Sequence, residues 1–315
     1  MEDFTPDIDR KDETWSYCVS EESVECLDAG RFLQMVHTKD EPSYAIFASD
    51  DNQVLTDVLE CLRDYKDIFS EEDAAKLLEL TKVSHPIVLK NGCEPPHMPI
   101  YSLSPKQTEV LWEYIKDKLC KSWIHPSCSS AEVPVLFAPK ADGGLRLCVN
   151  YHGLNTVTVN NCYPLPLIDE MLSHLAGTHY FSKVDLCDTY YQIRIKEGDE
   201  WKSTFCMKFG SFEYLVMPFG LLNAPATFQS YINRALVSLV DICCVVYLDD
   251  ILVFSDSEGD YEKHIRLVIE HLREYQLFAK LLKCAFKQQM ISYLGYVIDI
   301  EGIKMDLKRI QTIME

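Results

Sequence analysis

The sequence predicts an α+β fold in which an antiparallel sheet is backed by helices. Strand-like apolar segments come in pairs around short turns, which is typical of hairpins. Segments whose apolar residues have helical spacing lie between these pairs, and no internal repeat is evident. Hydrophobic residues make up 47% and charged residues 25% of the 315 residues, so the chain can bury one large core or two smaller ones.

The first third of the chain predicts little regular structure before one well-defined helix. Residues 1–56 are acidic without sustained periodicity, which indicates a disordered leader. Residues 57–80 have helical spacing, and the Pro-rich run at 94–105 predicts an extended connector, so 57–104 reads as a helical segment and connector. Ser104-Pro105-Lys106-Gln107 is a capping box with Pro at the first helical position, and it predicts a helix.

Strands and helices then alternate to the end of the chain. Residues 133–151 predict a hairpin around Ala-Asp-Gly-Gly, and a helix from Leu167 to Ala176 is closed by Gly177. The further elements expected are strands at 180–186 and 190–195, a hairpin around Gly210, a helix from Asn223, a hairpin at 245–254, a helix at 261–278 and a strand at 292–298.

Composition excludes several classes of protein. The longest apolar stretches, such as 242–248, are too short to cross a membrane, and the acidic start lacks the features of a secretory signal. We therefore expect a protein of the cytoplasm or nucleus with no membrane partner. The thirteen cysteines include no C-x-x-C pair, so we expect reduced thiols and no zinc site.

The net charge of -19 would argue against nucleic-acid binding if it were spread evenly, but most of it lies in one part of the chain. Residues 1–80 carry 22 Asp and Glu against 7 Lys and Arg, whereas the remainder carries 27 against 23. Phosphate contacts require Lys and Arg, and the nearly neutral remainder leaves them possible. The acidity is mainly a property of the leader.

Three carboxylates carry the chemistry that the sequence predicts. Asp249 and Asp250 lie at the tip of the hairpin at 245–254, but Asp is a common turn residue, and alone this pair is weak evidence. Asp185 lies inside an apolar strand, where an unpaired carboxylate costs several kcal/mol to bury unless a cation offsets it. Carboxylates from neighbouring strands can hold two hard cations such as Mg²⁺, with Mn²⁺ as an alternative.

Seven segments resemble the reverse transcriptases of gypsy-type long-terminal-repeat retrotransposons, most closely the fungal members. In chain order they are LSPKQTEVLWEYI, PVLFAPKADGGLRLCVNYHGLN, YPLPLIDEML, YFSKVDLCDTYYQIRI, FEYLVMPFGLLNAPATFQSYINRAL, VVYLDDILVFS and YLGYVI. The resemblance implies a fingers-and-palm fold over 105–315, with fingers at about 80–165 and 195–220 and the palm at about 166–194 and 221–300. Nothing resembling a thumb follows residue 310, so we expect a truncated copy with weak, non-processive activity.

The resemblance also implies roles for individual residues. Asp185, Asp249 and Asp250, with the Leu186 carbonyl, would hold two Mg²⁺ ions. Five residues would contact the incoming deoxynucleoside triphosphate: Lys140, Arg146, Tyr190, Phe219 and Gly220. Leu294, Gly295 and Tyr296 would grip the end of a primer on an RNA or DNA template. Without the resemblance these are surface charges, a core aromatic residue and plain turns.

Several positions depart from the resemblance. At five positions where the family usually has Arg, this chain has His or Cys: His125, His152, Cys162, Cys187 and Cys206. Asn150 stands where the family usually has Asp. Each change follows from one C-to-T transition, which suggests a mutationally decayed gene copy. Three functions therefore stay open: a working RNA-directed DNA polymerase, a folded but inactive remnant, and a two-metal nuclease or cyclase, which would not explain LVMPFGLLNAPATFQ. The oligomeric state is not predicted.

Overall fold

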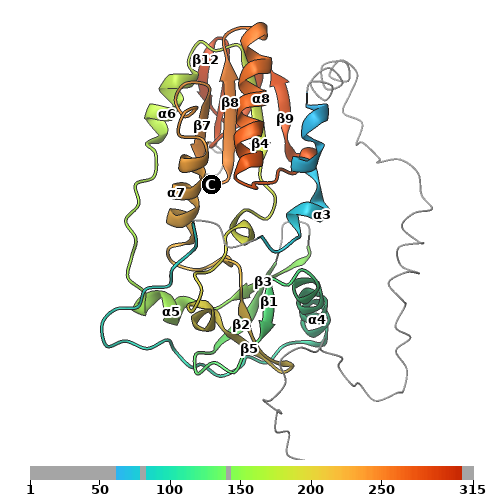
Figure 1. Ribbon diagram of the computed structural model, residues 1–315, viewed down its shortest axis with the longest axis vertical. Coiled ribbons are helices and arrows are strands. Elements are labelled where there is room, and N and C mark those ends of the chain that lie inside the picture. The colour runs from blue at the N-terminus through green and yellow to red at the C-terminus, as the bar shows by residue number, and fades with distance from the viewer. Residues whose placement is uncertain (1–61, 79–82, 140–142, 307–315) are drawn as a thin grey trace, which may run out of the picture. The chain divides into compact units, whose positions relative to one another are not determined.

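The computed structural model describes residues 62–78, 83–139 and 143–306, and within them the strands form three sheets (Figure 1). Sheet A has the order β7-β8-β4-β9, sheet B the order β1-β6-β5-β2-β3 and sheet C the order β10-β11-β12. No helix among these residues is long and apolar enough to cross a membrane. The predicted leader at 1–56 and Lys140 lie outside the described residues.

Sheet A is antiparallel throughout and separates two apolar layers. Its strands are β4 (Tyr180–Asp185), β7 (Cys244–Tyr247), β8 (Asp250–Ser255) and β9 (Ala285–Gln288). Because side chains alternate along a strand, Val184, Ile251 and Val253 face one core, whereas Phe181 and Leu252 face the other. The predicted antiparallel sheet with helices behind it is confirmed.

Helices cover the two faces of sheet A. Helices α7 (Ala224–Ala235) and α8 (Glu258–Glu274) bury Phe228, Ile232 and Ile265 in the first core. Helix α6 (Ile168–Leu175) and sheet C, made of β10 (Met290–Tyr293), β11 (Tyr296–Asp299) and β12 (Gly302–Met305), contribute to the second core. Both faces are thus partly covered, and Asp185 and Asp250 lie at one end of their strands.

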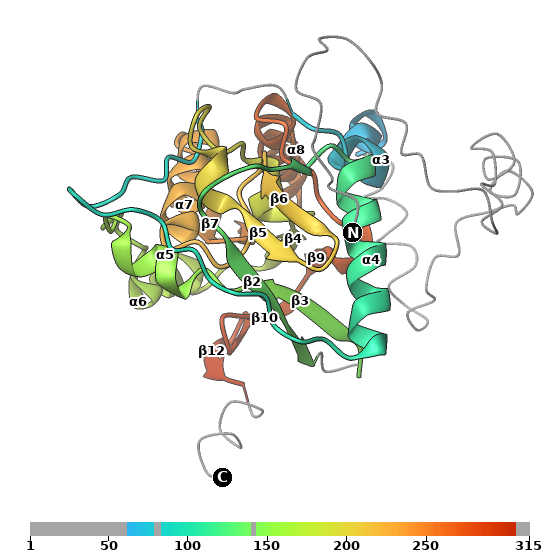
Figure 2. The same cartoon turned by 90° about the horizontal axis from the view of Figure 1, so that it is seen from below.

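Sheet B is formed from segments on both sides of β4 in the sequence. It contains β1 (Ile124–Pro126), β2 (Val133–Pro139), β3 (Leu145–Val149), β5 (Phe205–Met207) and β6 (Gly210–Tyr214). Its β2 and β5 pair in parallel, with Val133 opposite Phe205, while its other pairs are antiparallel. Helix α4 (Pro105–Cys120) packs beside β1 and β3 (Figure 2), and α5 (His152–Val157) follows β3.

Local sequence signals account for several of the helix ends. The capping box predicted at Ser104 and Gln107 is present with both hydrogen bonds, and Pro105 is the first helical residue. Gly177 follows α6 with φ +83, a conformation that glycine adopts without steric cost. Helix α8 begins at Glu258, earlier than predicted, because the Ser257 hydroxyl accepts a hydrogen bond from the Asp260 amide.

Three predicted elements are wrong. Residues 190–195 were expected to be a strand, but Asp188 has φ +42 and leads into the 3-10 helix η2 (Thr189–Gln192). The strand expected at 292–298 is a hairpin, since Leu294 and Gly295 have φ +51 and +81 and form a two-residue turn. The helix expected at 57–80 is, over its described residues, the 3-10 helix η1 (Arg63–Phe69) and the short α3 (Glu71–Ala74), separated by the extended Ser70.

A buried histidine makes the stability of this fold sensitive to acid. His85 is 2% exposed, and its Nδ1 atom lies 2.9 Å from the Thr227 hydroxyl. Burial lowers the pKa of His85 from 6.5 to about 4. Between these values the unfolded chain binds a proton that the folded chain does not. The contribution of His85 to the free energy of unfolding is therefore fully present above about pH 6.5 and is lost as the pH falls toward 4.

We therefore expect the free energy of unfolding to fall by about 3 kcal/mol from this residue alone between pH 7 and pH 4. Urea unfolding at several pH values would measure the loss. A His85→Gln variant, which keeps a polar group near Thr227 but does not titrate, should show a correspondingly shallower slope. Equal slopes in the two proteins would contradict this role of His85.

Candidate active site

Asp185 and Asp250 face each other across the centre of sheet A. Asp185 ends β4, Asp250 begins β8, and the two are register partners in the antiparallel pair. Residues directly opposite each other in such a pair carry their side chains on the same face, with Cβ atoms about 5 Å apart. Both side chains are half-buried, and they lie on the face opposite to Val184 and Ile251, which pack toward the helices.

Asp249 lies beside this pair in the turn between β7 and β8. Tyr247 pairs with Asp250, so Leu248 and Asp249 form a two-residue turn in which Leu248 has φ +54 and Asp249 is exposed. Gln229 of α7, which is fully buried, holds this turn from beneath. Its Oε1 atom accepts a hydrogen bond of 2.7 Å from the Leu248 amide, and its Nε2 atom lies 3.4 Å from the Val246 carbonyl.

Two lysines compensate the charge of the paired carboxylates. Lys183 Nζ lies 2.7 Å from Asp250 Oδ1, and Lys283 Nζ lies 3.6 Å from Asp185 Oδ1. Over the part of the chain that the structure describes, no three His, Cys, Asp or Glu side chains gather closely enough to hold a metal ion. The structure therefore brings Asp185 and Asp250 together as a pair and leaves Asp249 at the adjacent turn.

A pair of carboxylates fits a divalent hard cation. Mg²⁺ prefers oxygen ligands and is usually held by one or two carboxylates, with its other positions taken by water and substrate phosphates. The lysine ammonium groups show that positive charge is favourable at both oxygens. The Leu186 carbonyl, which the resemblance adds to the metal ligands, lies 3.4 Å from the Thr189 hydroxyl.

Tyr190 and Phe219 form an aromatic group next to the turn that carries Asp249. Their ring centroids are 4.7 Å apart at an interplanar angle of 82°, and Tyr190 also contacts Phe228 of α7. Burial raises the pKa of the Tyr190 hydroxyl, and the Asp249 carboxylate raises it further. Tyr190 therefore lies within the electrostatic reach of Asp249, whereas Phe219 is 54% exposed and available for contact.

Two asparagines that sequence reasoning missed join the backbone after Phe219 to the segment 155–161. Asn155 Nδ2 donates a hydrogen bond of 2.8 Å to the Gly220 carbonyl, and Asn155 Oδ1 accepts one of 2.9 Å from the Leu222 amide. Asn223 bonds in the same way to the Val159 carbonyl and the Asn161 amide. Gly220 has φ +98, which favours glycine. No spacing in the sequence signals these long-range contacts.

The remaining predicted site residues lie on separate elements. Arg146 is exposed on β3 opposite Ala138. Leu294 and Gly295 form the turn of sheet C, and Tyr296 begins β11. Sheet C is tied to the carboxylates, because the Tyr293 hydroxyl donates a hydrogen bond of 3.2 Å to the Asp250 carbonyl.

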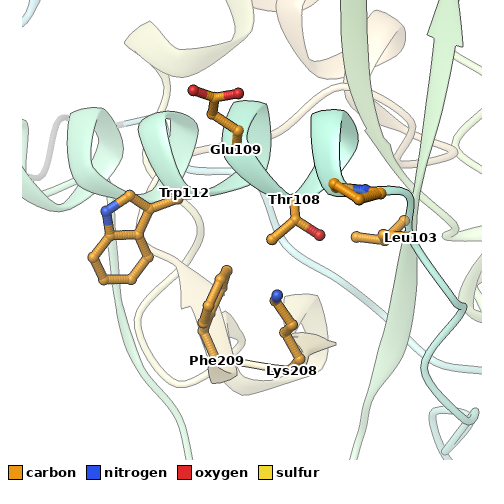
Figure 3. Close-up of a pocket in the computed structure, with 7 residues that line it drawn as sticks. Leu103, Thr108, Glu109, Trp112, Lys208 and Phe209 are labelled. Carbon is orange, nitrogen blue, oxygen red and sulfur yellow. The ribbon is translucent and has the colours of Figure 1, made fainter.

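Two cavities differ in their relation to these residues. One of ≈ 450 Å³ opens beside Asp185 and Leu186, and its lining carries both charges: Lys121, Lys280 and Lys283 with Glu71, Glu72 and Asp188. A larger one of ≈ 660 Å³ lies between the first turns of α4 and the tip of the β5–β6 hairpin (Figure 3). The ring centroids of Trp112 and Phe209 are 5.0 Å apart there. None of the predicted site residues lines the larger cavity, so only the smaller one belongs to the candidate site.

One of the protein-family models matches this chain, and curated relatives match a longer stretch of it. The family model for "Reverse transcriptase (RNA-dependent DNA polymerase)" matches residues 138–298. The Transposon Tf2-3 and Tf2-7 polyproteins of Schizosaccharomyces pombe are each 34% identical over 263 residues. The matched region is 80% of this chain but only 19% of each polyprotein.

Solved structures share the fold at low sequence identity. The foamy viral protease-reverse transcriptase in complex with an RNA/DNA hybrid has a TM-score of 0.74 at 20% identity, covering 85% of this chain and 36% of that one. The same viral protein in complex with dsDNA has a TM-score of 0.71 at 21% identity, covering 85% and 56%. The family model spans 161 of the 315 residues and includes all three carboxylates. This chain therefore belongs to the reverse transcriptase (RNA-dependent DNA polymerase) family.

Proposed function

We propose that this chain is the polymerase part of a gypsy-type retrotransposon polyprotein and adds deoxynucleotides to a primer on an RNA or DNA template. The observation that carries the proposal is the direct opposition of Asp185 and Asp250 on sheet A, with Asp249 in the adjoining turn. The foamy viral structures of the same fold are complexes with an RNA/DNA hybrid and with dsDNA, which supports such a template here.

Two Mg²⁺ ions would activate the primer 3′-hydroxyl and stabilise the leaving pyrophosphate. The residues proposed to hold them are Asp185, Asp249 and Asp250, with the Leu186 carbonyl. The support is the position of Asp185 and Asp250 at one end of β4 and β8, where lysines compensate their charge, and of Asp249 in the adjoining turn. The cavity beside Asp185 is lined by acidic as well as basic side chains, and its three lysines would bind the phosphates of a nucleotide, because ammonium groups bind phosphate oxygens.

The nucleotide contacts are proposed for Tyr190 of η2, for the segment between β6 and α7, and for the β2–β3 hairpin. Tyr190 would stand against the ribose 2′-position, which its contact with Phe219 and its proximity to Asp249 support. Phe219 and Gly220 would lie under the nucleotide on a backbone that Asn155 holds in place. Lys140 and Arg146 would bind the triphosphate, and Leu294, Gly295 and Tyr296 would grip the primer end. The fingers at about 80–165 and 195–220, and the palm at about 166–194 and 221–300, belong to the same proposal.

Primer extension tests this function. With Mg²⁺, deoxynucleoside triphosphates and a primed RNA template, the purified chain should extend the primer, and a chelator should stop the reaction. Asp249→Asn should reduce extension by about a hundredfold or more, because it removes a negative charge from the metal site. A chain that is folded by circular dichroism but extends no primer with Mg²⁺ or Mn²⁺ would favour the inactive remnant instead.

A further inference from the structure

Lys183 occupies an unusual place for a lysine, in β4, which is one of the two internal strands of sheet A. It pairs with Leu252 on one side and Ala285 on the other, and it shares a face of β4 with Phe181 and Asp185. Its ammonium group reaches diagonally across the strand pair to Asp250, at 2.7 Å. The side chain is 27% exposed and that of Asp250 34%, so water screens this ion pair only in part.

Lys183 differs in this respect from the second lysine of the site. Lys283 lies on the 3-10 helix η4 (Leu281–Lys283), is 61% exposed and approaches Asp185 only to 3.6 Å. A long, exposed side chain at that distance is easily displaced, whereas Lys183 is fixed by the strands on either side. The two carboxylates thus have different cationic partners, one built into the sheet and one on its edge.

Electrostatics explains why a built-in cation is useful here. Two carboxylates directly opposite each other in a strand pair repel, and like charges in this position destabilise a sheet. A lysine on the same face offsets this repulsion when no metal ion is bound. A divalent cation bound to the same oxygens would be repelled by the ammonium group of Lys183. This repulsion is stronger where the charges are partly shielded from water.

We propose that Lys183 is an internal counter-ion of the carboxylate site, which holds Asp250 in the absence of metal and competes with the divalent ion for it. This inference rests on the proposed function, because it assumes that Asp185 and Asp250 bind the metal. Lys183 is a positioning residue in this scheme and touches no substrate. The affinity of the site for metal then depends on Lys183 as well as on the carboxylates.

Direct binding of Mn²⁺ to the full chain, without nucleic acid or nucleotide, tests the inference. Electron paramagnetic resonance of free Mn²⁺ would give the dissociation constant. Lys183→Met, which keeps an unbranched side chain up to Cε but removes the ammonium group, should bind Mn²⁺ about five- to tenfold more tightly than the wild type. Lys183→Arg should bind like the wild type. Lys263→Met, which breaks an exposed Lys263–Asp260 pair on α8, should not change the affinity.

The melting temperature gives a second readout that keeps the test decisive. Without metal, Lys183→Met should melt below the wild type, and Mn²⁺ should raise its melting temperature more than that of the wild type. Unchanged or weaker Mn²⁺ binding by Lys183→Met, or no Mn²⁺ binding by any of these proteins, would overturn the inference.

The proposed function has its own point of failure in the same measurements. Mn²⁺ binding that survives Asp185→Asn and Asp250→Asn would show that the metal binds elsewhere, and both proposals would fall. A wild type that extends primers while Lys183→Met binds Mn²⁺ with unchanged affinity would remove only the role of Lys183.

Discussion

Replacing Asp185 by Asn should reduce single-turnover nucleotide addition by at least about a thousandfold. Asn keeps the size of the side chain but cannot supply the negative charge that a divalent ion requires. The fold should survive, because Asp185 is half-buried at the end of β4 and its backbone carbonyl would still accept the 2.8 Å hydrogen bond from the Lys280 amide. Rapid-quench measurement of one incorporated deoxynucleotide would determine the rate.

Asp256→Asn is the matched control for this experiment. Asp256 is exposed and follows the other end of β8, so the same chemical change there leaves the paired carboxylates untouched. We expect its rate to equal that of the wild type. Equal losses in the two variants would mean that the reaction depends on overall charge and that Asp185 has no special place in it.

Replacing Gln229 by Leu should damage both stability and activity. The variant leaves the Leu248 amide without the acceptor that holds the turn, and a buried polar group without a partner costs about 1–3 kcal/mol. Because the same turn carries Asp249, a shift of about 1 Å there should also lower the rate by about a hundredfold. Urea unfolding and single-turnover kinetics would measure the two effects.

Asn233→Ala is the control for the Gln229→Leu experiment, because it changes α7 without removing a contact to the β7–β8 turn. Asn233 lies one helical turn after Gln229 and bonds to its Nε2 atom and to the Tyr163 hydroxyl, but not to the turn itself. Its loss should be smaller in both measurements. A Gln229→Leu variant with normal kinetics would show that the β7–β8 turn keeps its conformation without support from α7.

The sequence predicted those parts of the fold that depend on local signals. The helix from Pro105 needs only its capping box, and the hairpin of β7 and β8 needs only two apolar strands and a short turn. Asp185, which the structure places at the end of β4, was recognisable because a carboxylate in a mainly apolar strand requires a partner. Local patterns were therefore sufficient to predict β4, β7 and β8 but not the edge strand β9, and the cost of burying a carboxylate singled out Asp185.

Long-range contacts and unusual backbone angles escaped the same reasoning. Leu294 carries a large apolar side chain at φ +51, so its segment resembled a continuous strand. Gln229, Asn155 and Lys183 act on residues between 17 and 67 positions away, and spacing along the chain cannot reveal such pairs. The opposition of Asp185 to Asp250 follows only from the register of β4 with β8, which the sequence does not specify by itself.

The parallel pairing of β2 with β5 ties the order of folding to the order of synthesis. Val133 cannot meet Phe205 until β4, which lies between them in the sequence, has left the ribosome. Sheet B is therefore completed late, after a strand of sheet A has been synthesised between its two halves. Contacts of such wide sequence separation slow folding, so a nascent chain of this kind exposes unpaired strand edges for longer and depends more on chaperones.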